Sequence, residues 1–175
     1  MSIYLGKKVD VLMDQRRAVM YLLVASTLLV AAAVLIMRDQ SDQNHRYRPQ
    51  GNESPLLRFV TEHLLDPSGG IYTNLRDDLG LEPDMAGNHQ MLSESTGLMM
   101  EYALRTNRRA LFDTQAHFLR TRLMTREGGI RWVYEKDGPY GDVHVNAAID
   151  DLKIIAALLD ASERWEDGGY GRLAD

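Results

Sequence analysis

The sequence predicts an all-α protein in which one membrane-spanning helix precedes part of a toroid of helical hairpins. Three observations lead to this prediction. There is a run of 20 uncharged residues near the N-terminus, a repeat with an offset of 59 residues further on, and an alternation of amphipathic helices with helices that are apolar nearly all round. The 175 residues allow one domain and an appendage.

Composition excludes several classes of protein. The chain has no cysteine, which excludes disulfide frameworks, thiolate metal sites and thiol catalysis. Residues 38–175 carry 16 basic and 23 acidic side chains, and such an acidic region without basic clusters argues against nucleic acid as a partner. The histidines lack metal-ligand spacing, so we expect neither a metal nor a cofactor.

Residues 18–37 are predicted to be a transmembrane signal-anchor helix. They contain no charge, Gly or Pro, and a helix of this length reaches about 30 Å, the hydrocarbon thickness of a bilayer. Basic residues in the segment 1–17 place that segment in the cytoplasm, so the rest of the chain would lie outside the cell membrane. Two alternatives stay open: a buried core helix, and a signal peptide cleaved near residues 31–33, which would leave a secreted protein.

Residues 38–53 hold almost no apolar side chains and are expected to form a solvated linker. The domain is predicted to begin at residue 54, because Ser54-Pro55 is typical of an N-cap followed by proline in the first helical turn.

From residue 54 onward the chain repeats itself. Phe59 and Phe118 each lie ten residues before a Gly-Gly-Ile run, which begins at Gly69 in the first copy and at Gly128 in the second. A helix, a Gly-Gly turn, a loop and a second helix make one unit, and repeats of this size indicate stacked helical hairpins. The 122 residues from 54 to 175 hold just over two such units, so the ring would be incomplete.

The two helices of a unit differ in character. Residues 109–124 place their large apolar side chains on one face, which predicts an outer helix with one wet side. Residues 149–159 are apolar nearly all round and residues 98–104 are similar, so both are expected to be inner helices enclosed by others. Alternating outer and inner helices predict an α/α barrel.

Carboxylates open both predicted inner helices, Glu94 in one and Asp150 with Asp151 in the other. In a toroid these helix starts line one end of the ring, where paired carboxylates are the groups that glycoside hydrolysis requires. The alternative is that each acid only complements a helix dipole. Aromatic side chains in the preceding loops are candidates for stacking on sugars, or else pack on helix ends: Tyr72, Trp132, Tyr134 and Tyr140.

Two motifs resemble glycoside hydrolase family 8. Residues 129–132, residues 136–138 and the segment from Asp151 resemble that family, whose signature is similar to A-[ST]-D-[AG]-D-x-x-[IM]-A-x-[SA]-L-L-x-A-x-x-x-[FW]. The positions in register with this signature are Ala147, Asp151, Ile154, Ala157, Leu158, Leu159, Ala161 and Trp165. Ser93-Glu94 also resembles the family's Ser-Glu helix start, whose glutamate is the general acid. The resemblance implies the N-terminal part of an (α/α)6 barrel that mostly inverts configuration while cutting β-linked glucans, chitosan or xylan.

The chain departs from that pattern at one catalytic position. Ile149 occupies the place of the first aspartate of the signature, whereas Asp150 stands where a small residue is expected and Asp151 matches the second aspartate. The resemblance also implies a further catalytic aspartate on a later hairpin, beyond residue 175. One partner of the acid is therefore expected to be missing from this chain.

The resulting hypothesis is a membrane-anchored, outward-facing glycoside hydrolase that acts on a polysaccharide, with Glu94 as the proton donor. The resemblance implies an inverting mechanism. Alternatives are a non-catalytic glycan-binding or exopolysaccharide-assembly protein, an α-helical lyase or uronyl hydrolase on the same toroid, and a truncated gene product with exposed inner helices.

Overall fold

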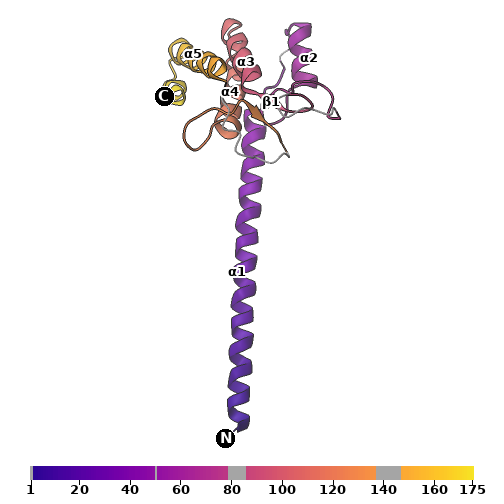
Figure 1. Cartoon of the computed structure of the whole chain (residues 1–175), viewed down its shortest axis with the longest axis vertical. Coiled ribbons are helices and arrows are strands. Elements are labelled where there is room, and N and C mark those ends of the chain that lie inside the picture. The colour runs from indigo at the N-terminus through magenta and orange to yellow at the C-terminus, as the bar shows by residue number, and fades with distance from the viewer. Residues whose placement is uncertain (1, 50, 79–85, 137–146) are drawn as a thin grey trace. The chain divides into compact units, whose positions relative to one another are not determined.

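The structure is a computed structural model that describes residues 2–49, 51–78, 86–136 and 147–175, with the side chains of 2–19 and 42 left out. It divides into two compact units, Met1–Ser41 and Asp42–Asp175. The first unit is the greater part of one long helix, α1, Ser2–His45 (Figure 1).

Helix α1 is long and apolar enough to cross a membrane. An 18-residue window within Met20–His45 has a mean hydropathy of 2.5 and is 0% buried, and Leu22 and Leu29 are 70% and 71% exposed. This exposure is not that of a buried core helix, one of the alternatives considered for residues 18–37. The helix also continues past residue 37 through the polar residues that we expected to begin the linker.

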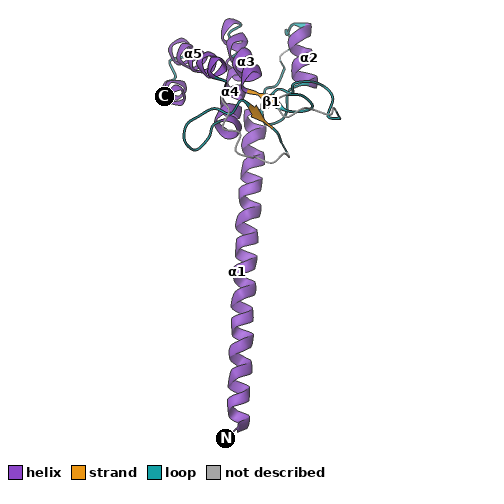
Figure 2. Ribbon diagram, viewed as in Figure 1, coloured by secondary structure: helices purple, strands orange, loops and turns teal. Residues whose placement is uncertain are grey.

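The described residues of the second unit form helices and one small antiparallel sheet (Figure 2). Its helices are α2 (Pro55–His63), α3 (Ser93–Arg105), α4 (Arg109–Phe118), the π-helical turn η1 (Leu119–Leu123), α5 (Ala148–Arg164) and α6 (Gly168–Ala174). Helix α3 packs against α4 and α5, and α5 packs against α6. This packing agrees with the predicted stack of helical hairpins. Helix α4, which we expected to be an outer helix with one wet side, is instead buried at seven of its ten residues.

Local sequence signals act as expected at two helices. The Ser54 hydroxyl caps α2 by accepting a hydrogen bond from the Leu57 amide at 3.2 Å, with Pro55 as the first helical residue. In the predicted outer helix the large apolar side chains of one face are all buried: Leu111, Phe112, Phe118, Leu119 and Leu123. Arg122, a charged residue of the same predicted helix, is buried as well.

The two Gly-Gly turns have the same backbone structure. Leu65 pairs with Ile71 in an isolated bridge, and 59 residues later Met124 pairs with Ile130. The Leu65 amide donates to the carbonyl five residues earlier at 3.0 Å, and the Met124 amide does the same at 2.9 Å. The first glycine of each turn has a positive φ, +101° in one and +88° in the other, a conformation that favours glycine. The repeat read from the sequence is therefore a structural repeat.

The predicted linker, residues 38–53, differs from our expectation in its second part. Tyr47 is buried in the core, and its hydroxyl donates to the carboxylate of Glu53, which is buried too. Arg108 lies 3.5 Å from that carboxylate. Burial, together with the hydrogen bond to Glu53, raises the pKa of Tyr47 to about 12. Tyr47 and Glu53 thus hold against the core a polar segment whose composition predicted a solvated linker. The compact unit begins at residue 42 rather than 54.

Helix α5 is not enclosed as predicted. Its buried face carries Ile154, Leu158 and Ala161, but Ile149 and Leu152 on the opposite face are 70% and 66% exposed. The cause is geometric, because an inner helix of a toroid needs neighbours on several sides. In the second unit the helices packed closely against α5 are α3 and α6.

Candidate functional site

The starts of the two inner helices lie side by side. Strand β1 (Met91–Leu92) leads directly into α3 and pairs with β2 (Val133–Tyr134), which lies in the loop before α5. The Ser93 amide donates to the Trp132 carbonyl at 3.0 Å, and the Ser93 hydroxyl is 3.4 Å from Asp150 Oδ2 on α5. The expectation that the two helices begin at a common place is therefore met.

A glycine permits this close approach. A Cβ atom added at Gly97 would lie 3.3 Å from Ile154 Cγ1 and 3.7 Å from Lys153 Cβ. A larger side chain on this face of α3 would push the helices apart and separate Ser93 from Asp150.

The three candidate carboxylates have different surroundings. Glu94 lies in the first turn of α3 and is exposed to solvent. Asp150 is 15% exposed, lies beside Ser93 and is 3.8 Å from the Lys153 ammonium one turn along α5. Asp151 is half-buried in the same first turn. One carboxylate therefore faces solvent while another is held at the junction between the two helices.

The four candidate aromatic residues do not form one surface. Trp132 is half-buried beside Ser93. Tyr134 is buried and meets Phe118 edge-to-face at 5.8 Å, so its ring belongs to the core, as the alternative interpretation had it. Tyr72 stacks on His89 at 4.4 Å and donates its hydroxyl to Asp66. Tyr140 lies outside the described residues.

A buried carboxylate that the sequence analysis missed lies beside Tyr72. Asp66 is 2% exposed and accepts hydrogen bonds from the Ser68 amide at 2.8 Å and the Ser68 hydroxyl at 2.6 Å. Lys136 adds an ammonium group at 3.4 Å. Burial alone would raise the pKa of Asp66, but the hydrogen bonds from Ser68 and Tyr72 and the charge of Lys136 together lower it. The turn-forming sequence Asp-Pro-Ser-Gly at 66–69 was the signal that could have found it.

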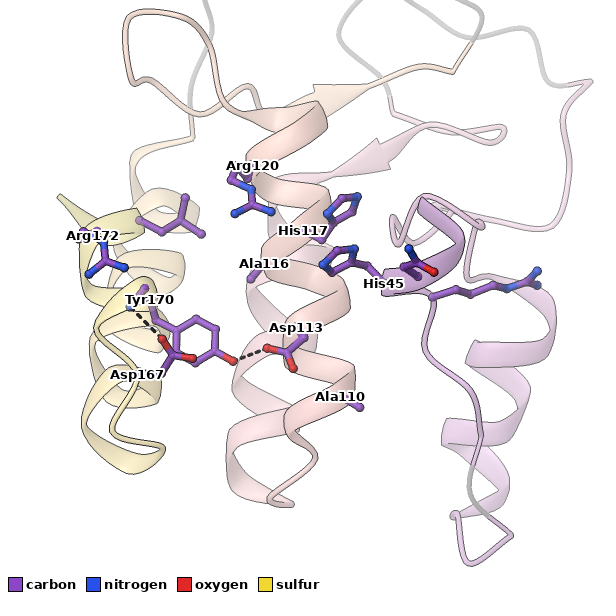
Figure 3. Close-up of a pocket in the computed structure, with 13 residues that line it drawn as sticks. His45, Ala110, Asp113, Ala116, His117, Arg120, Asp167, Tyr170 and Arg172 are labelled. Carbon is purple, nitrogen blue, oxygen red and sulfur yellow. Dashed lines mark hydrogen bonds between the residues drawn. The ribbon is translucent and has the colours of Figure 1, made fainter. Parts of the chain in front are cut away.

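Among the described residues, no group of three or more His, Asp and Glu side chains is arranged to hold a metal ion. A pocket of about 600 Å³ lies elsewhere, between α4, α6 and residues 44–46 (Figure 3). The described candidate residues, Glu94, Asp150, Asp151, Tyr72, Trp132 and Tyr134, do not line it.

Comparisons with known proteins agree with the hairpin architecture. The chain is 32% identical over 105 residues to YdaJ of Bacillus subtilis (strain 168), a candidate lipoprotein, and covers 28% of its length. It is 37% identical to a solved structure from Clostridium perfringens described as a novel α-amylase, with a TM-score of 0.58 over 68% of this chain and 34% of the other. A GH8 endo-β-1,4-glucanase from an Achatina fulica gut metagenomic library shows the same fold at 22% identity, with a TM-score of 0.56 over 73% of this chain and 38% of the other.

The chain thus spans about a third of the length of these solved relatives. The model of the glycosyl hydrolases family 8 matches residues 81–175, more than half of the chain, and includes α3, α4, α5 and α6. Helix α2 and the first Gly-Gly turn precede the matched residues. By this match and by its fold, the chain belongs to glycoside hydrolase family 8, of which it carries part of the (α/α)6 domain.

Proposed function

We propose that this protein is a membrane-anchored glycoside hydrolase that acts on a polysaccharide outside the cell. The observation that carries the proposal is the contact between the starts of α3 and α5, where Ser93 and Asp150 are 3.4 Å apart, in a chain of family 8. Residues 18–37 are the anchor, with residues 1–17 in the cytoplasm. The proposal is supported by the exposed apolar side chains of α1 between Met20 and Met37.

Glu94 is the proposed proton donor and Asp150 the proposed positioning residue. Hydrolysis needs one carboxylic acid to protonate the leaving oxygen and a second group to orient or activate water. The exposed Glu94 can reach a bound chain, whereas Asp150 is held by Ser93 and Lys153 and is suited to fixing a hydroxyl group. Asp151 remains a second candidate for that role. An inverting mechanism requires about 6.5–9.5 Å between the acid and base carboxyls.

Trp132 and Tyr72 are the proposed sugar-stacking residues. Both are half-buried, and the Trp132 backbone is tied directly to the start of α3. We leave Tyr134 out because its ring is buried against Phe118. Our expectation of a β-linked substrate came from the family resemblance. One relative is described as an α-amylase and another as an endo-β-1,4-glucanase, so substrate tests include both linkages.

The test compares Glu94→Gln with Glu101→Gln in the full chain, purified in detergent. Glu101 lies on the same helix and pairs with Arg105, which makes its substitution a matched control. Reducing ends released from β-glucan, starch, chitosan and xylan are measured. We expect E94Q to lower the rate by about 10²–10⁴-fold and E101Q to leave it within about twofold. Hydrolysis that survives in E94Q would contradict the assignment of the proton donor.

A second candidate function, non-catalytic glycan binding or exopolysaccharide assembly, is favoured by one specific observation. Ile149 occupies the position of the first aspartate of the signature, and its side chain is 70% exposed beside the helix junction. An apolar side chain there can contact a sugar but cannot accept a proton. Binding of an oligosaccharide by the wild-type chain without products after long incubation would support this function. Activity gained in Ile149→Asp would instead show that the lost carboxylate limits catalysis.

A further inference from the structure

Helix α5 presents a row of apolar side chains to solvent. Leu152 is 66% exposed and Leu159 is 47% exposed, and Ala156 between them is exposed as well. These three residues are four and three positions apart, so they lie above one another on one face of the helix. A row with this spacing is the pattern by which one helix packs against another. We call these three residues the exposed row of α5.

The exposed row is complementary to itself. Leu152 lies four residues before Ala156, and Leu159 lies three residues after it. If two α5 helices packed antiparallel with Ala156 at the centre, each Leu152 would therefore meet the Leu159 of the other copy. The two Ala156 side chains would meet at the centre, where small side chains let the helix axes approach to about 8 Å. A two-fold interface requires this property, because the same surface is used by both subunits.

Charged side chains beside the exposed row match in the same way. Lys153 lies three residues before Ala156 and Asp160 four residues after it, and both are exposed. Seven residues make about two helical turns, so the two side chains lie on the same side of the row. In the antiparallel pair each Lys153 would face the Asp160 of the other copy.

The chain itself leaves these two charges available for such a contact. The Lys153 ammonium lies 3.8 Å from Asp150, at the edge of the ion-pair range, and its side chain is 41% exposed. Among the residues that the structure describes, Asp160 makes no ion pair. One symmetry operation thus matches apolar with apolar positions and a cation with an anion.

We propose that two copies of this chain associate through α5, antiparallel and about a two-fold axis at Ala156. A second copy is the occupant because the apolar and the charged positions match under the same operation, which a different partner would not require. One helix pair makes a contact at the small end of stable interfaces, so the association depends on protein concentration. The inference is independent of the proposed function, since it uses neither Glu94 nor a bound sugar.

The first test is cross-linking of the full chain in detergent. The chain has no cysteine, so Ala156→Cys introduces one thiol, placed at the proposed two-fold axis. A disulfide forms only where two Cα atoms come within about 7 Å of each other. On mild oxidation we expect a disulfide-linked dimer of A156C on a non-reducing gel, in a yield that rises with protein concentration. Arg105→Cys, at an exposed position of α3, is the matched control and should give at least fivefold less dimer.

The second test reverses the charges in the A156C background. Lys153→Glu places two carboxylates opposite each other at both ends of the contact, and we expect the yield of dimer to fall about threefold or more. Asp160→Lys added to K153E restores opposite charges and should restore the yield. The contact between Lys153 and Asp150 of the same chain is lost in both variants, so this recovery measures the contact between copies.

A further variant replaces the apolar side chains of the row. Leu152→Ala combined with Leu159→Ala changes residues that are exposed in one copy, so the fold should tolerate it while the yield of dimer falls. Thermal unfolding followed by circular dichroism checks that each variant is folded.

Three results would overturn the proposal: A156C that cross-links no more than R105C, a yield that K153E leaves unchanged, or a folded charge-reversed variant that cross-links no better than K153E. The first result would also mean that the exposed row is free or is covered by a different chain.

Discussion

The two Gly-Gly turns have the same backbone but opposite surroundings. In the first, residues 65–71, both glycines are buried, and the Gln115 amide donates to the Gly69 carbonyl at 2.9 Å. In the second, residues 124–130, both glycines are exposed. Asp66 of the first turn corresponds to Thr125 of the second, and each side chain accepts a hydrogen bond from a backbone amide within its own turn. The shared hydrogen bonds determine the backbone conformation of both turns. The packing of neighbouring helices determines which side chains each turn can accommodate.

The largest expected effect comes from Gly70→Ala. A Cβ atom at Gly70 would lie 2.2 Å from Met91 Sδ and 2.6 Å from the Phe118 ring, so the core must shift to admit it. We expect a loss of about 3 kcal/mol in the free energy of unfolding, measured by urea denaturation of the full chain in detergent. Gly129→Ala is the matched control, because its Cβ would meet only Thr125 Oγ1 at 3.5 Å, and it should change stability by less than about 0.5 kcal/mol. Equal losses in the two variants would contradict the difference in packing.

The next effect concerns the buried charge. Asp66→Asn removes a carboxylate that accepts hydrogen bonds from four groups. We expect it to lower the free energy of unfolding by about 1–3 kcal/mol at neutral pH. Because the folded pKa of Asp66 lies below its ordinary value of 3.8, the unfolded chain binds more protons in that range. The stability from Asp66 is therefore present above this value and is lost as the pH falls through the folded pKa. Urea titrations between pH 3 and 7 should show that the free energy of unfolding falls less steeply with decreasing pH in D66N than in the wild type. Parallel plots of this free energy against pH would argue against a buried, ionised Asp66.

A smaller effect is expected at the position of the second turn that corresponds to Asp66. Thr125→Ala removes the hydroxyl that accepts the Gly129 amide at 3.1 Å, but this turn is exposed and water can replace the acceptor. A loss of about 0.5–1 kcal/mol is expected by the same urea measurement. A loss as large as that of Asp66→Asn would show that the second turn is tied into the core as firmly as the first.

The comparison also shows what the sequence could predict. The sequence repeat and the hydrophobic periodicity predicted the hairpins, the Gly-Gly turns and the buried face of α4, because these features depend on local spacing. They did not find the Asp66 cluster or the burial of Tyr47 with Glu53 and Arg108. Each of these clusters includes a residue from a distant segment, since Lys136 lies 70 residues after Asp66 and Arg108 lies 55 residues after Glu53.

The same difference between local and long-range contacts applies to the candidate site residues. The adjacency of Ser93 and Asp150 could be predicted from the helix starts, since hairpins stacked in register bring equivalent ends together. The pocket between α4, α6 and residues 44–46 could not, because its walls come from three separate segments. Ile149 and Leu152 were expected to be enclosed from their apolar character alone. Apolar character predicts that a side chain is buried, but it does not indicate whether one of the described helices lies against it.

The central claim is that a polysaccharide binds at the joined starts of α3 and α5. Hydrogen exchange followed by mass spectrometry tests it most directly, with the full chain in detergent and oligosaccharides of β- and α-linked glucose in turn. We expect slower exchange in peptides that cover residues 91–97 and 148–152, and unchanged exchange over 168–174. Protection that is confined to other segments, or its absence at both helix starts with every oligosaccharide, would show that the polysaccharide does not bind there.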